Sequence, residues 1–454
     1  MNINLSVKCD ECSNQTNCRV GMSNRDIQPL MFSCKGCGSF IGLDFKVKDP
    51  NSLDTRAIKA ILAAKSPREA KTNEGVSYRI TGAREVAVKH GFNTSLDFVD
   101  LHLDFPVGFG PYIMGRTPYL EASARAGSKM AEFHRFRLHL INQHYKKYPQ
   151  VVKLIEMYIN GFYGPFRETA RKRFKIKVKS SNMEDINAAL YAIVSQFVLP
   201  FTLPDDNSTI VRLYTGTIMD LYEKNKDGMA GFLQEIFDTK FLSHLQRDCL
   251  KIYKPIFDAE LPLRPALFLD VDRTYVAGTA AMRVSTHNFY ECREVFKDMA
   301  EILNRQLVLV AGLNNLIKRG DHNVFGKGIR ITKDGKELAP SSLSKYADIS
   351  LGNKLLDLDD PWHVIDPLAL DNELRNAIAH NKIDYDEVTQ VITYYPKLEG
   401  MEREKKVQIQ LLDFMWRMLL LFREIHRLHH LVKCLNYALL IKPTASLLNR
   451  PQSS

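Results

Sequence analysis

The sequence lacks any long hydrophobic run. None of its 454 residues belongs to a stretch that approaches the roughly 18 uncharged apolar residues of a membrane-spanning helix, and the most apolar segment, 414–422, contains Arg417. The N-terminal segment also lacks the apolar run of a secretory signal. Cysteines are few, and five of the eight lie between positions 9 and 37. Because disulfide scaffolds spread their cysteines through the chain, this clustering favours a metal site in a reducing compartment. We therefore expect a cytoplasmic protein without a membrane segment.

The composition excludes several classes of protein and leaves one strong charge signal. With 45% hydrophobic and 25% charged residues, the chain is neither disordered nor collagen-like. Its formal net charge is +10. Residues 128–180 carry 13 basic and 3 acidic side chains, whereas residues 286–454 carry 23 and 22. The whole surplus is therefore local, which points to a polyanionic partner bound by one segment.

The pattern of hydrophobic residues predicts a mainly α fold (α+β overall) in three regions. These are a zinc ribbon at 1–50, a mostly helical middle region at 51–285, and a helical bundle with a β-hairpin insertion at 286–454. Asp366 and Pro367 predict the start of a capped helix in the last region. We expect helices at 55–64, 117–146, 149–160, 183–198, 209–224, 229–253, 288–318, 366–381 and 405–435. We expect strands at 96–103, 175–179, 266–271 and 388–395, and a hairpin at 329–338.

Two C-x-x-C pairs stand near the N-terminus, at 9–12 and 34–37. Each pair can form a turn that directs two thiolates at one Zn²⁺, and two such turns complete a tetrahedral site. Gly36 and Gly38 supply the backbone freedom that such a turn uses. The pattern resembles a zinc ribbon, and it predicts a structural zinc ion. The predicted ligands are Cys9, Cys12, Cys34 and Cys37. We interpret Cys18, which stands outside the two pairs, as a free thiol.

The basic segment 128–180 interleaves positive residues with aromatic ones. Lysine and arginine neutralise phosphates and aromatic faces stack on unpaired bases, so the pattern favours RNA binding. A solvated helix surface is the alternative, and for the aromatic residues we favour packing in the core. The predicted RNA-binding residues are Arg135, Arg137, Lys146, Lys147, Arg167, Arg171, Lys172, Arg173 and Lys175.

The segment 373–381, ELRNAIAHN, combines an arginine, an asparagine and a histidine at a short spacing. Asn376 and His380 are four residues apart and share one helix face. Arg375 and His380 are about 140° apart around an ideal helix, so a single regular helix does not direct both side chains at one point. An arginine and a histidine could still meet if the backbone deviates near the helix end, or if a second copy of the helix faces the first across a two-fold axis.

This segment resembles the nuclease motif of the HEPN superfamily (higher eukaryotes and prokaryotes nucleotide-binding), in which four to six residues lie between an arginine and a histidine. Arg375, Asn376 and His380 match its R-N-x-x-x-H form. Long helices before and after the motif also match, and the resemblance covers about 286–440. It implies a homodimer that cleaves RNA without metal, often with added sensing domains in antiviral defence or as a toxin. A trigger molecule or partner protein is then expected.

Three other patterns keep alternatives open. Asp270 and Asp272 form a D-x-D-x-T sequence that resembles the first motif of haloacid-dehalogenase-like phosphohydrolases, which use Mg²⁺. The ribbon and the basic segment together would also suit an RNA-binding scaffold without catalytic activity. Arg375 can instead form an ion pair with Glu373, Asp371 or Asp384, and His380 can instead cap the C-terminus of its helix. A third pattern is the set of histidines at 426, 429 and 430, which we interpret as favourable charge near a helix C-terminus rather than a metal site.

Overall fold

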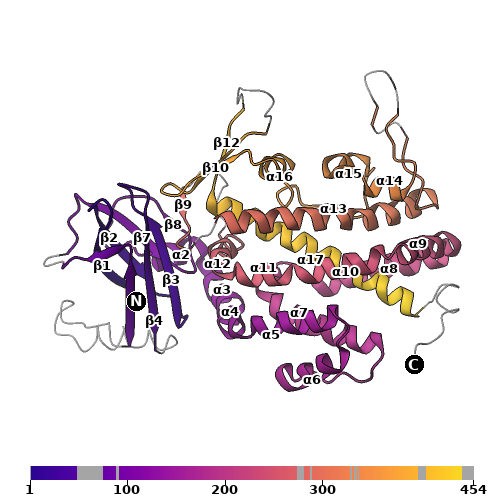
Figure 1. Cartoon of the computed structure of the whole chain (residues 1–454), viewed down its shortest axis with the longest axis horizontal. Coiled ribbons are helices and arrows are strands. Elements are labelled where there is room, and N and C mark those ends of the chain that lie inside the picture. The colour runs from indigo at the N-terminus through magenta and orange to yellow at the C-terminus, as the bar shows by residue number, and fades with distance from the viewer. Residues whose placement is uncertain are drawn as a thin grey trace. The chain divides into compact units, whose positions relative to one another are not determined.

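The computed structural model describes residues 2–48, 75–87, 91–272, 281–286, 289–327, 330, 331, 335, 337–396 and 405–441. The fold is mixed α+β and mainly helical, with small sheets (Figure 1). The chain divides into two compact units. Unit 1 comprises residues 1–146, 258–293 and 377–419, and unit 2 comprises residues 147–257, 294–376 and 420–454. Each unit combines separate parts of the chain, so neither follows the predicted boundaries at 50 and 285.

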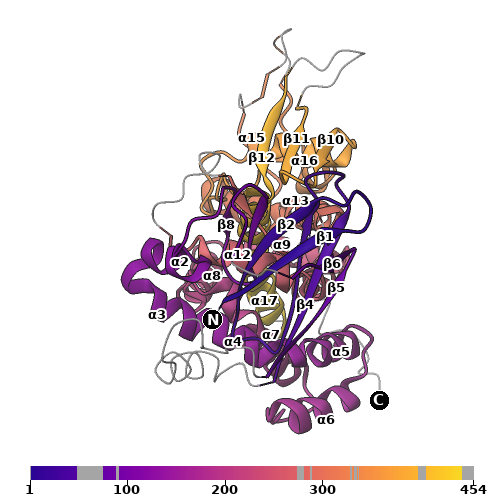
Figure 2. The same ribbon diagram turned by 90° about the vertical axis from the view of Figure 1, so that its left-hand side faces the viewer.

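Unit 1 holds the described strands of the chain, in four small sheets. The strands are β1 (Asn2–Cys9), β2 (Gln15–Gly21), β3 (Ile27–Ser33), β4 (Phe40–Val47), β5 (Val76–Thr81), β6 (Ala83–Glu85), β7 (Asp97–His102), β8 (Val107–Gly108), β9 (Met282–Arg283), β10 (Ile383–Asp386), β11 (Val391–Tyr394) and β12 (Val407–Gln410). The first sheet has the order β6-β1-β2-β7 and the second β3-β4-β5. Figure 2 labels β1, β2, β4, β5 and β6 among these strands. A third sheet, β10-β11-β12, follows the predicted nuclease motif, and β8 pairs with β9.

The first two sheets share one hydrophobic core. Alternate residues of β4 are buried, from Ile41 to Val47, as expected for strands with one face on a core. Leu5 of β1 lies opposite Cys18 of β2, and both side chains are buried in the same cluster. Val99 of β7 joins this cluster, and β7 pairs with β2 in parallel. The two sheets that contain the strands of the segment 1–50 are therefore completed by strands beyond position 75. The segment does not form a separate ribbon.

The helices of unit 1 include an irregular run between positions 118 and 144. The helices of this unit are α2 (Pro118–Ala126), α3 (Met130–Phe133), α4 (His139–His144) and α12 (Glu260–Phe268). A π-helical turn, His134–Leu138, lies between α3 and α4. The Thr117 side chain caps the start of α2 by accepting a hydrogen bond from the Leu120 backbone N–H. The helix α12 replaces the strand predicted at 266–271.

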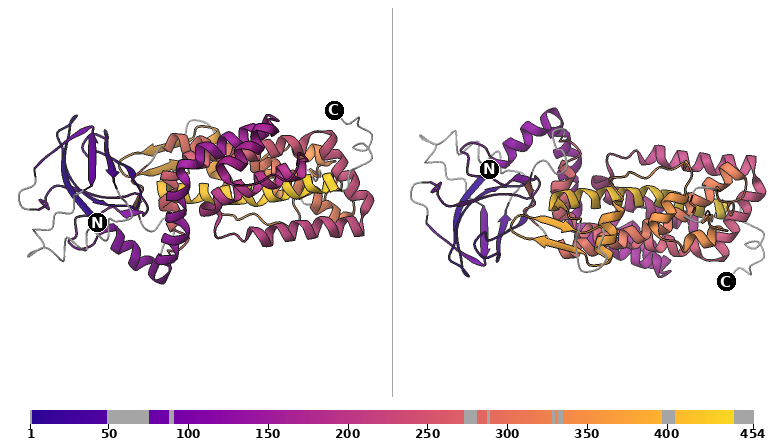
Figure 3. Two further views of the ribbon diagram at one scale, coloured as in Figure 1. Left: turned by 90° about the horizontal axis from the view of Figure 1, so that it is seen from below. Right: turned by 90° about the horizontal axis from the view of Figure 1, so that it is seen from above.

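Unit 2 is built from helices (Figure 3). Three helices contribute more than one residue to each unit: α13 (Phe289–Arg319), α16 (Asn372–Ala379) and α17 (Leu411–Ile441). Within unit 2, α13 and α17 lie side by side, and the Gln306 amide donates to the Ile425 carbonyl oxygen at 2.9 Å. The other helices are α5 (Tyr148–Ile159), α6 (Tyr163–Phe174), α7 (Met183–Thr202), α8 (Asn207–Lys224), α9 (Lys226–Asp238), α10 (Phe241–Lys251), α11 (Tyr253–Asp258), α14 (Leu343–Ala347) and α15 (Leu351–Asp357).

Several predictions for helices and strands are confirmed. The helices expected at 149–160, 183–198, 209–224 and 288–318 are present, as are the strands expected at 96–103 and 388–395. The helix expected at 229–253 is two helices, α9 and α10. An isolated antiparallel bridge joins Ile331 and Glu337 inside the predicted hairpin. The helix predicted at 55–64 lies outside the described residues.

Three further predictions are wrong. Residues 175–179 form no strand, because Lys175 takes a left-handed conformation (φ +60°) that ends α6. Asp366 and Pro367 form a turn, and the helix starts six residues later, where the Asp371 carboxylate accepts from the Leu374 backbone N–H at 2.9 Å. The histidines of α17 are buried well before its end, and burial lowers the pKa of His426 to about 3. They therefore contribute no charge at the helix terminus.

Among the described residues, no single helix is long and apolar enough to span a membrane. One bent pair, Met183–Thr202 with Asn207–Lys224, meets the same criteria of length and composition across a bend of 119°.

Candidate metal centre and candidate catalytic motif

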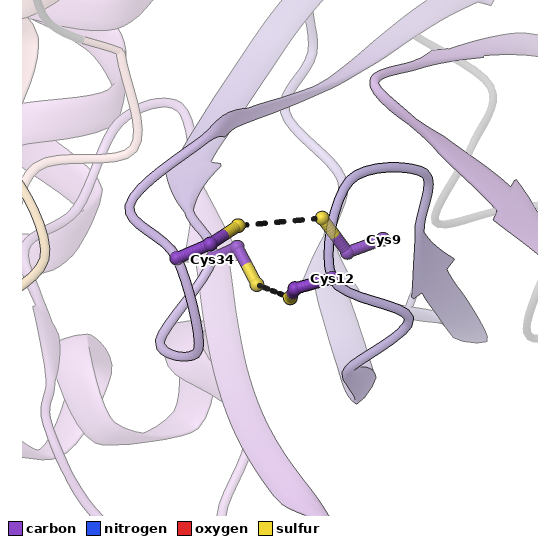
Figure 4. Close-up of side chains that lie close together, drawn as sticks. Cys9, Cys12 and Cys34 are labelled. Atoms are coloured by element: carbon purple, nitrogen blue, oxygen red, sulfur yellow. Dashed lines mark hydrogen bonds between the residues drawn. The ribbon is translucent and has the colours of Figure 1, made fainter.

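The four predicted cysteine ligands lie together in unit 1. Their sulfur atoms are all within 4.8 Å of one another. Cys9 and Cys12 come from the end of β1 and the loop that leads to β2, and Cys34 belongs to the loop between β3 and β4 (Figure 4). Cys37 belongs to the same loop as Cys34. Two antiparallel hairpins therefore each present one C-x-x-C turn to the same point.

The sulfur separations suit a tetrahedral metal ion. The Cys9 and Cys37 sulfurs are 3.7 Å apart, and those of Cys12 and Cys34 are 3.6 Å apart. A tetrahedron with metal–sulfur bonds of about 2.3 Å has edges of about 3.8 Å. A disulfide would require about 2.05 Å, and all the cysteines here are free thiols. The four cysteines can therefore hold a metal ion such as zinc.

The loops of the hairpins are shaped for this arrangement. Gly38 has a φ of +77°, which confirms its predicted role in the turn. A Cβ on Gly36 would lie 3.1 Å from the Cys12 sulfur, so glycine leaves room for the ligand. Hydrogen bonds with the side chain and backbone of Ser39 lower the pKa of the Cys37 thiol to about 6. This favours the thiolate, the form that binds metal, at Cys37. The backbone hydrogen bond at Asn14 lowers the pKa of the Cys12 thiol, but hydrogen bonds with the other three thiols and burial outweigh it, so that this pKa is instead raised.

Polar residues around the cysteines link the two hairpins to β7. The Asn14 amide lies 4.0 Å from the Cys34 sulfur and donates to the Asp97 carboxylate at 3.0 Å. Lys35 forms an ion pair with the same carboxylate at 2.9 Å. These hydrogen bonds, first that from Lys35, lower the pKa of Asp97. Such outer contacts orient metal ligands. Cys18 lies outside the cluster, with its sulfur buried 3.9 Å from the Thr16 carbonyl oxygen.

The second candidate site is the R-N-x-x-x-H segment on α16. Leu374 and Ile378 are buried, as predicted, and they anchor the helix. The guanidinium of Arg375 is half-buried and donates to the Asn376 side-chain oxygen at 3.0 Å. It also forms an ion pair with Glu301 of α13, which is not one of the acidic neighbours considered from the sequence. Among the described residues, the buried Nε of Arg375 has no hydrogen-bond partner.

A cavity of about 480 Å³ adjoins the arginine. It is lined by Asn372, Arg375 and Asn376 and by residues 350–356 at α15. The structure therefore brings Arg375 and Asn376 together at a surface depression in unit 2. The cavity is open to solvent.

His380 is exposed and directly follows the last residue of α16. Asn381 takes a left-handed conformation (φ +54°), and the Lys382 backbone N–H donates to the Ala377 carbonyl oxygen at 2.7 Å, which ends the helix. The backbone thus departs from helical geometry at the residue after the histidine. The convergence of His380 with Arg375 stays a prediction.

The predicted RNA-binding residues differ in their burial and in their partners. Arg137 is buried and forms an ion pair with Asp270 at 2.7 Å, so it does not fit the predicted role. Lys146 forms an ion pair with Asp26 at 2.7 Å. Arg135 and Lys147 are exposed. The aromatic Phe174 packs on Phe197, as favoured from the sequence.

The remaining basic residues gather on α6 and the segment after it. We call this set the α6 basic surface. Every member is exposed, and Glu168 is the only acidic residue between 163 and 179. Lys172 forms an ion pair with Glu168. The members are Arg167, Arg171, Lys172, Arg173, Lys175, Lys177 and Lys179.

The carboxylates of the alternative phosphohydrolase motif are held by arginines. Asp270 pairs with Arg137, and Asp272 pairs with Arg125. The motif follows α12 rather than a strand, and residues 273–280 lie outside the described part of the chain. The described fold therefore lacks the strand from which that chemistry starts.

No protein-family model matches the chain, and no curated protein or solved structure is significantly similar to it. The resemblance to HEPN nucleases therefore stays a prediction that rests on the motif residues.

Proposed function

We propose that the chain is a metal-independent endoribonuclease of the HEPN type, with Arg375, Asn376 and His380 at its catalytic centre. The main support for this proposal is the exposure and the surroundings of the motif residues in the structure. Arg375 lines a solvent-open cavity with an unpartnered Nε among the described residues, and His380 is exposed at the end of the same helix.

The residues suit cleavage by the RNA's own 2′-hydroxyl. His380 removes the proton of that hydroxyl, whose oxygen attacks the adjacent phosphorus, or it protonates the departing 5′-oxygen. Arg375 binds the phosphate and stabilises the negative charge that builds up in the transition state. Asn376 holds the guanidinium through its side-chain oxygen. The products are a 2′,3′-cyclic phosphate and a 5′-hydroxyl, and DNA resists because it lacks the nucleophile.

The proposal includes a homodimer, in which two copies of the motif line one cleft. It also includes a structural zinc ion on the four cysteines and a cytoplasmic location. A defence or toxin effector that responds to a trigger would fit this combination of domains. If a strictly monomeric protein still cleaved RNA, the two-copy site would be wrong but the nuclease assignment would stand.

Glu301→Gln is expected to strengthen RNA binding. The Glu301 carboxylate neutralises Arg375 in the free protein and competes with the phosphate for its guanidinium. An exposed ion pair contributes up to about 1 kcal/mol, or about fivefold in affinity. We therefore expect KM for RNA to fall by up to about fivefold and kcat to change by less than about threefold.

Steady-state kinetics on a short fluorogenic RNA give both constants. Glu294→Gln is the matched control, because Glu294 lies on the same helix and pairs with Lys297 instead. A rise in KM for Glu301→Gln would mean that the carboxylate positions Arg375 for the phosphate rather than competing with it.

Neutralising Arg171, Lys172 and Arg173 is expected to weaken RNA binding and its salt dependence. Each phosphate contact to a single strand adds about 0.7 to the slope of log K against log salt. Loss of three contacts should lower that slope by about 2 while kcat at saturating RNA stays unchanged. Fluorescence anisotropy across a salt series measures the slope.

A matched triple variant removes the same charge elsewhere in unit 2. Lys224, Lys226 and Lys251 are exposed lysines outside the α6 basic surface, and their replacement by alanine should leave the slope within about 0.5 of wild type. Equal losses in both triple variants would show that binding follows net charge and not this surface.

A non-catalytic RNA-binding scaffold is the second candidate, and the α6 basic surface favours it. Incubating RNA with wild type and with His380→Ala, in the presence of EDTA, separates the candidates. Cleavage by wild type alone supports the nuclease. RNA binding by both without cleavage supports the scaffold. Cleavage that is lost to EDTA and to Asp270→Ala would support the phosphohydrolase.

A further inference from the structure

A second cavity, of about 450 Å³, lies within unit 1 and has no role in the proposed nuclease. We call it the β2–β7 cavity. Its walls come from β2, β7, the segment that follows β8, and the turn between β10 and β11. Its volume falls in the usual range of small-molecule sites, about 300–1,000 Å³.

The most unusual residue in this cavity is Arg283 of β9, whose side chain is buried. Its Nη1 has no hydrogen-bond partner among the described residues, and none of their carboxylates forms an ion pair with it. Its guanidinium lies over the Phe109 ring, 4.4 Å from the centroid. Burial lowers the pKa of Arg283 to about 10, so it remains charged at neutral pH.

The other buried arginines described in unit 1 each have a carboxylate. Arg19 pairs with Asp100, Arg25 with Glu260, Arg137 with Asp270, and Arg264 with Asp104 and Glu260. A buried charge without a partner is costly because it has lost its hydration. Carboxylates therefore neutralise the other buried arginines described in unit 1, whereas the charge of Arg283, in the wall of the cavity, is not neutralised by one.

The backbone fixes Arg283 in this position. It lies opposite Val107 in the β8–β9 pair. The next residue, Val284, is held by the Gln390 side-chain amide, which accepts from its N–H and donates to its carbonyl oxygen, both at 2.8 Å. These hydrogen bonds hold the backbone next to Arg283 in place, which favours a site that is formed before an anion binds.

The rest of the wall has the chemistry of a base and sugar site. Phe98 and Tyr112 line the cavity and meet edge to face, with ring centroids 5.3 Å apart. Flat rings of this kind stack on nucleic-acid bases. The charged residues Lys35 and Asp97, which pair with each other, also line the cavity. Hydroxyl and amide side chains that can bind ribose hydroxyls and base edges lie in the same wall: Thr16, Asn17, Ser33, Asn93, Thr94 and Thr389.

We propose that the β2–β7 cavity binds a phosphorylated nucleotide, with the phosphate on Arg283 and the base against the aromatic wall. The nucleotide is either free or the 5′-phosphorylated end of an RNA strand. Val388 and Thr389 of the cavity belong to the hairpin whose first strand starts three residues after His380. We further propose that this nucleotide is the trigger of the nuclease, a role that rests on the proposed nuclease function.

Binding is tested without any measurement of cleavage. Isothermal titration calorimetry compares AMP, UMP, the matching nucleosides, inorganic phosphate, and a hexanucleotide RNA with a 5′-phosphate or a 5′-hydroxyl. The hexanucleotides carry 2′-O-methyl groups so that they cannot be cleaved. We expect a phosphorylated probe to bind at least tenfold more tightly than its unphosphorylated form. AMP or UMP binding identifies a free nucleotide, and binding of the 5′-phosphorylated hexamer alone identifies a strand end.

Arg283→Met separates a ligand site from a structural role. Removal of an uncompensated buried charge should raise the melting temperature of the ligand-free protein and abolish binding of the phosphorylated probe. Arg79→Met, an exposed residue of β5, is the matched control and should bind like wild type. A lower melting temperature for Arg283→Met, unchanged binding in that variant, or equal affinity for inorganic phosphate and nucleotide would each overturn the proposal. Loss of RNA cleavage alone would leave it standing.

Discussion

His380→Ala is expected to reduce kcat for RNA cleavage by about 10²–10⁴-fold, the usual contribution of a general acid or base. Alanine cannot carry a proton in the neutral pH range, and no buried packing is lost because the His380 side chain is exposed. RNA affinity and melting temperature should therefore stay close to wild type. Single-turnover cleavage of a labelled RNA measures the loss of rate, and fluorescence anisotropy measures the RNA affinity separately.

His244→Ala is the matched control for this variant, because His244 is an exposed histidine on α10 and lies outside the motif. It should cleave RNA at the wild-type rate. Full activity in His380→Ala would remove the histidine from the mechanism. A large loss in both variants would point to a general effect of surface histidines and not to a catalytic one.

Cys34→Ser is expected to cause the largest loss of stability in unit 1. The Cys34 side chain is fully buried and its sulfur belongs to the four-thiol cluster. Structural zinc contributes about 10–16 kcal/mol to the folding of isolated zinc-finger peptides. Here the two sheets also share a hydrophobic core. We therefore expect a smaller loss of about 5 kcal/mol, or roughly 10–20 °C in melting temperature.

Elemental analysis and thermal unfolding measure the two consequences together. Wild type should contain one zinc ion per chain, and Cys34→Ser much less. Cys18→Ala is the control, because this buried cysteine lies outside the cluster, and the variant should keep its zinc despite a modest loss of packing. Metal-free wild type, or an unchanged melting temperature in Cys34→Ser, would contradict a structural metal.

Local spacing allowed the metal centre to be predicted from the sequence, but not the sheets around it. Two C-x-x-C pairs are each a short-range pattern, and the fold brings all four thiols together. The strands that complete the sheets are distant in sequence: Val7 of β1 lies opposite Glu85, and Thr16 of β2 lies opposite Asp97. Pairing at such separations leaves no periodic signal within the segment 1–50.

Ion pairs between residues that are distant in the sequence could not be predicted for the same reason. Arg137 looked like part of an RNA-binding segment because its neighbours are basic, but its partner Asp270 is 133 residues away. Glu301, 74 residues from Arg375, was missed for the same reason. Arg283 offered no signal at all, because an arginine without a carboxylate is recognised only when its surroundings are known. Counting charges along a sequence therefore finds basic segments but not their partners.

The chemistry of the new RNA ends tests the proposed nuclease most directly. A defined RNA is incubated with wild type in the presence of EDTA, and the fragments are identified by mass spectrometry and by sequencing of their ends. Zinc content is measured after the incubation to show that the metal centre is intact. We expect 2′,3′-cyclic phosphate and 5′-hydroxyl ends, and no cleavage where the attacking nucleotide is 2′-deoxy. Fragments with 3′-hydroxyl and 5′-phosphate ends, or cleavage that requires a divalent cation, would contradict it.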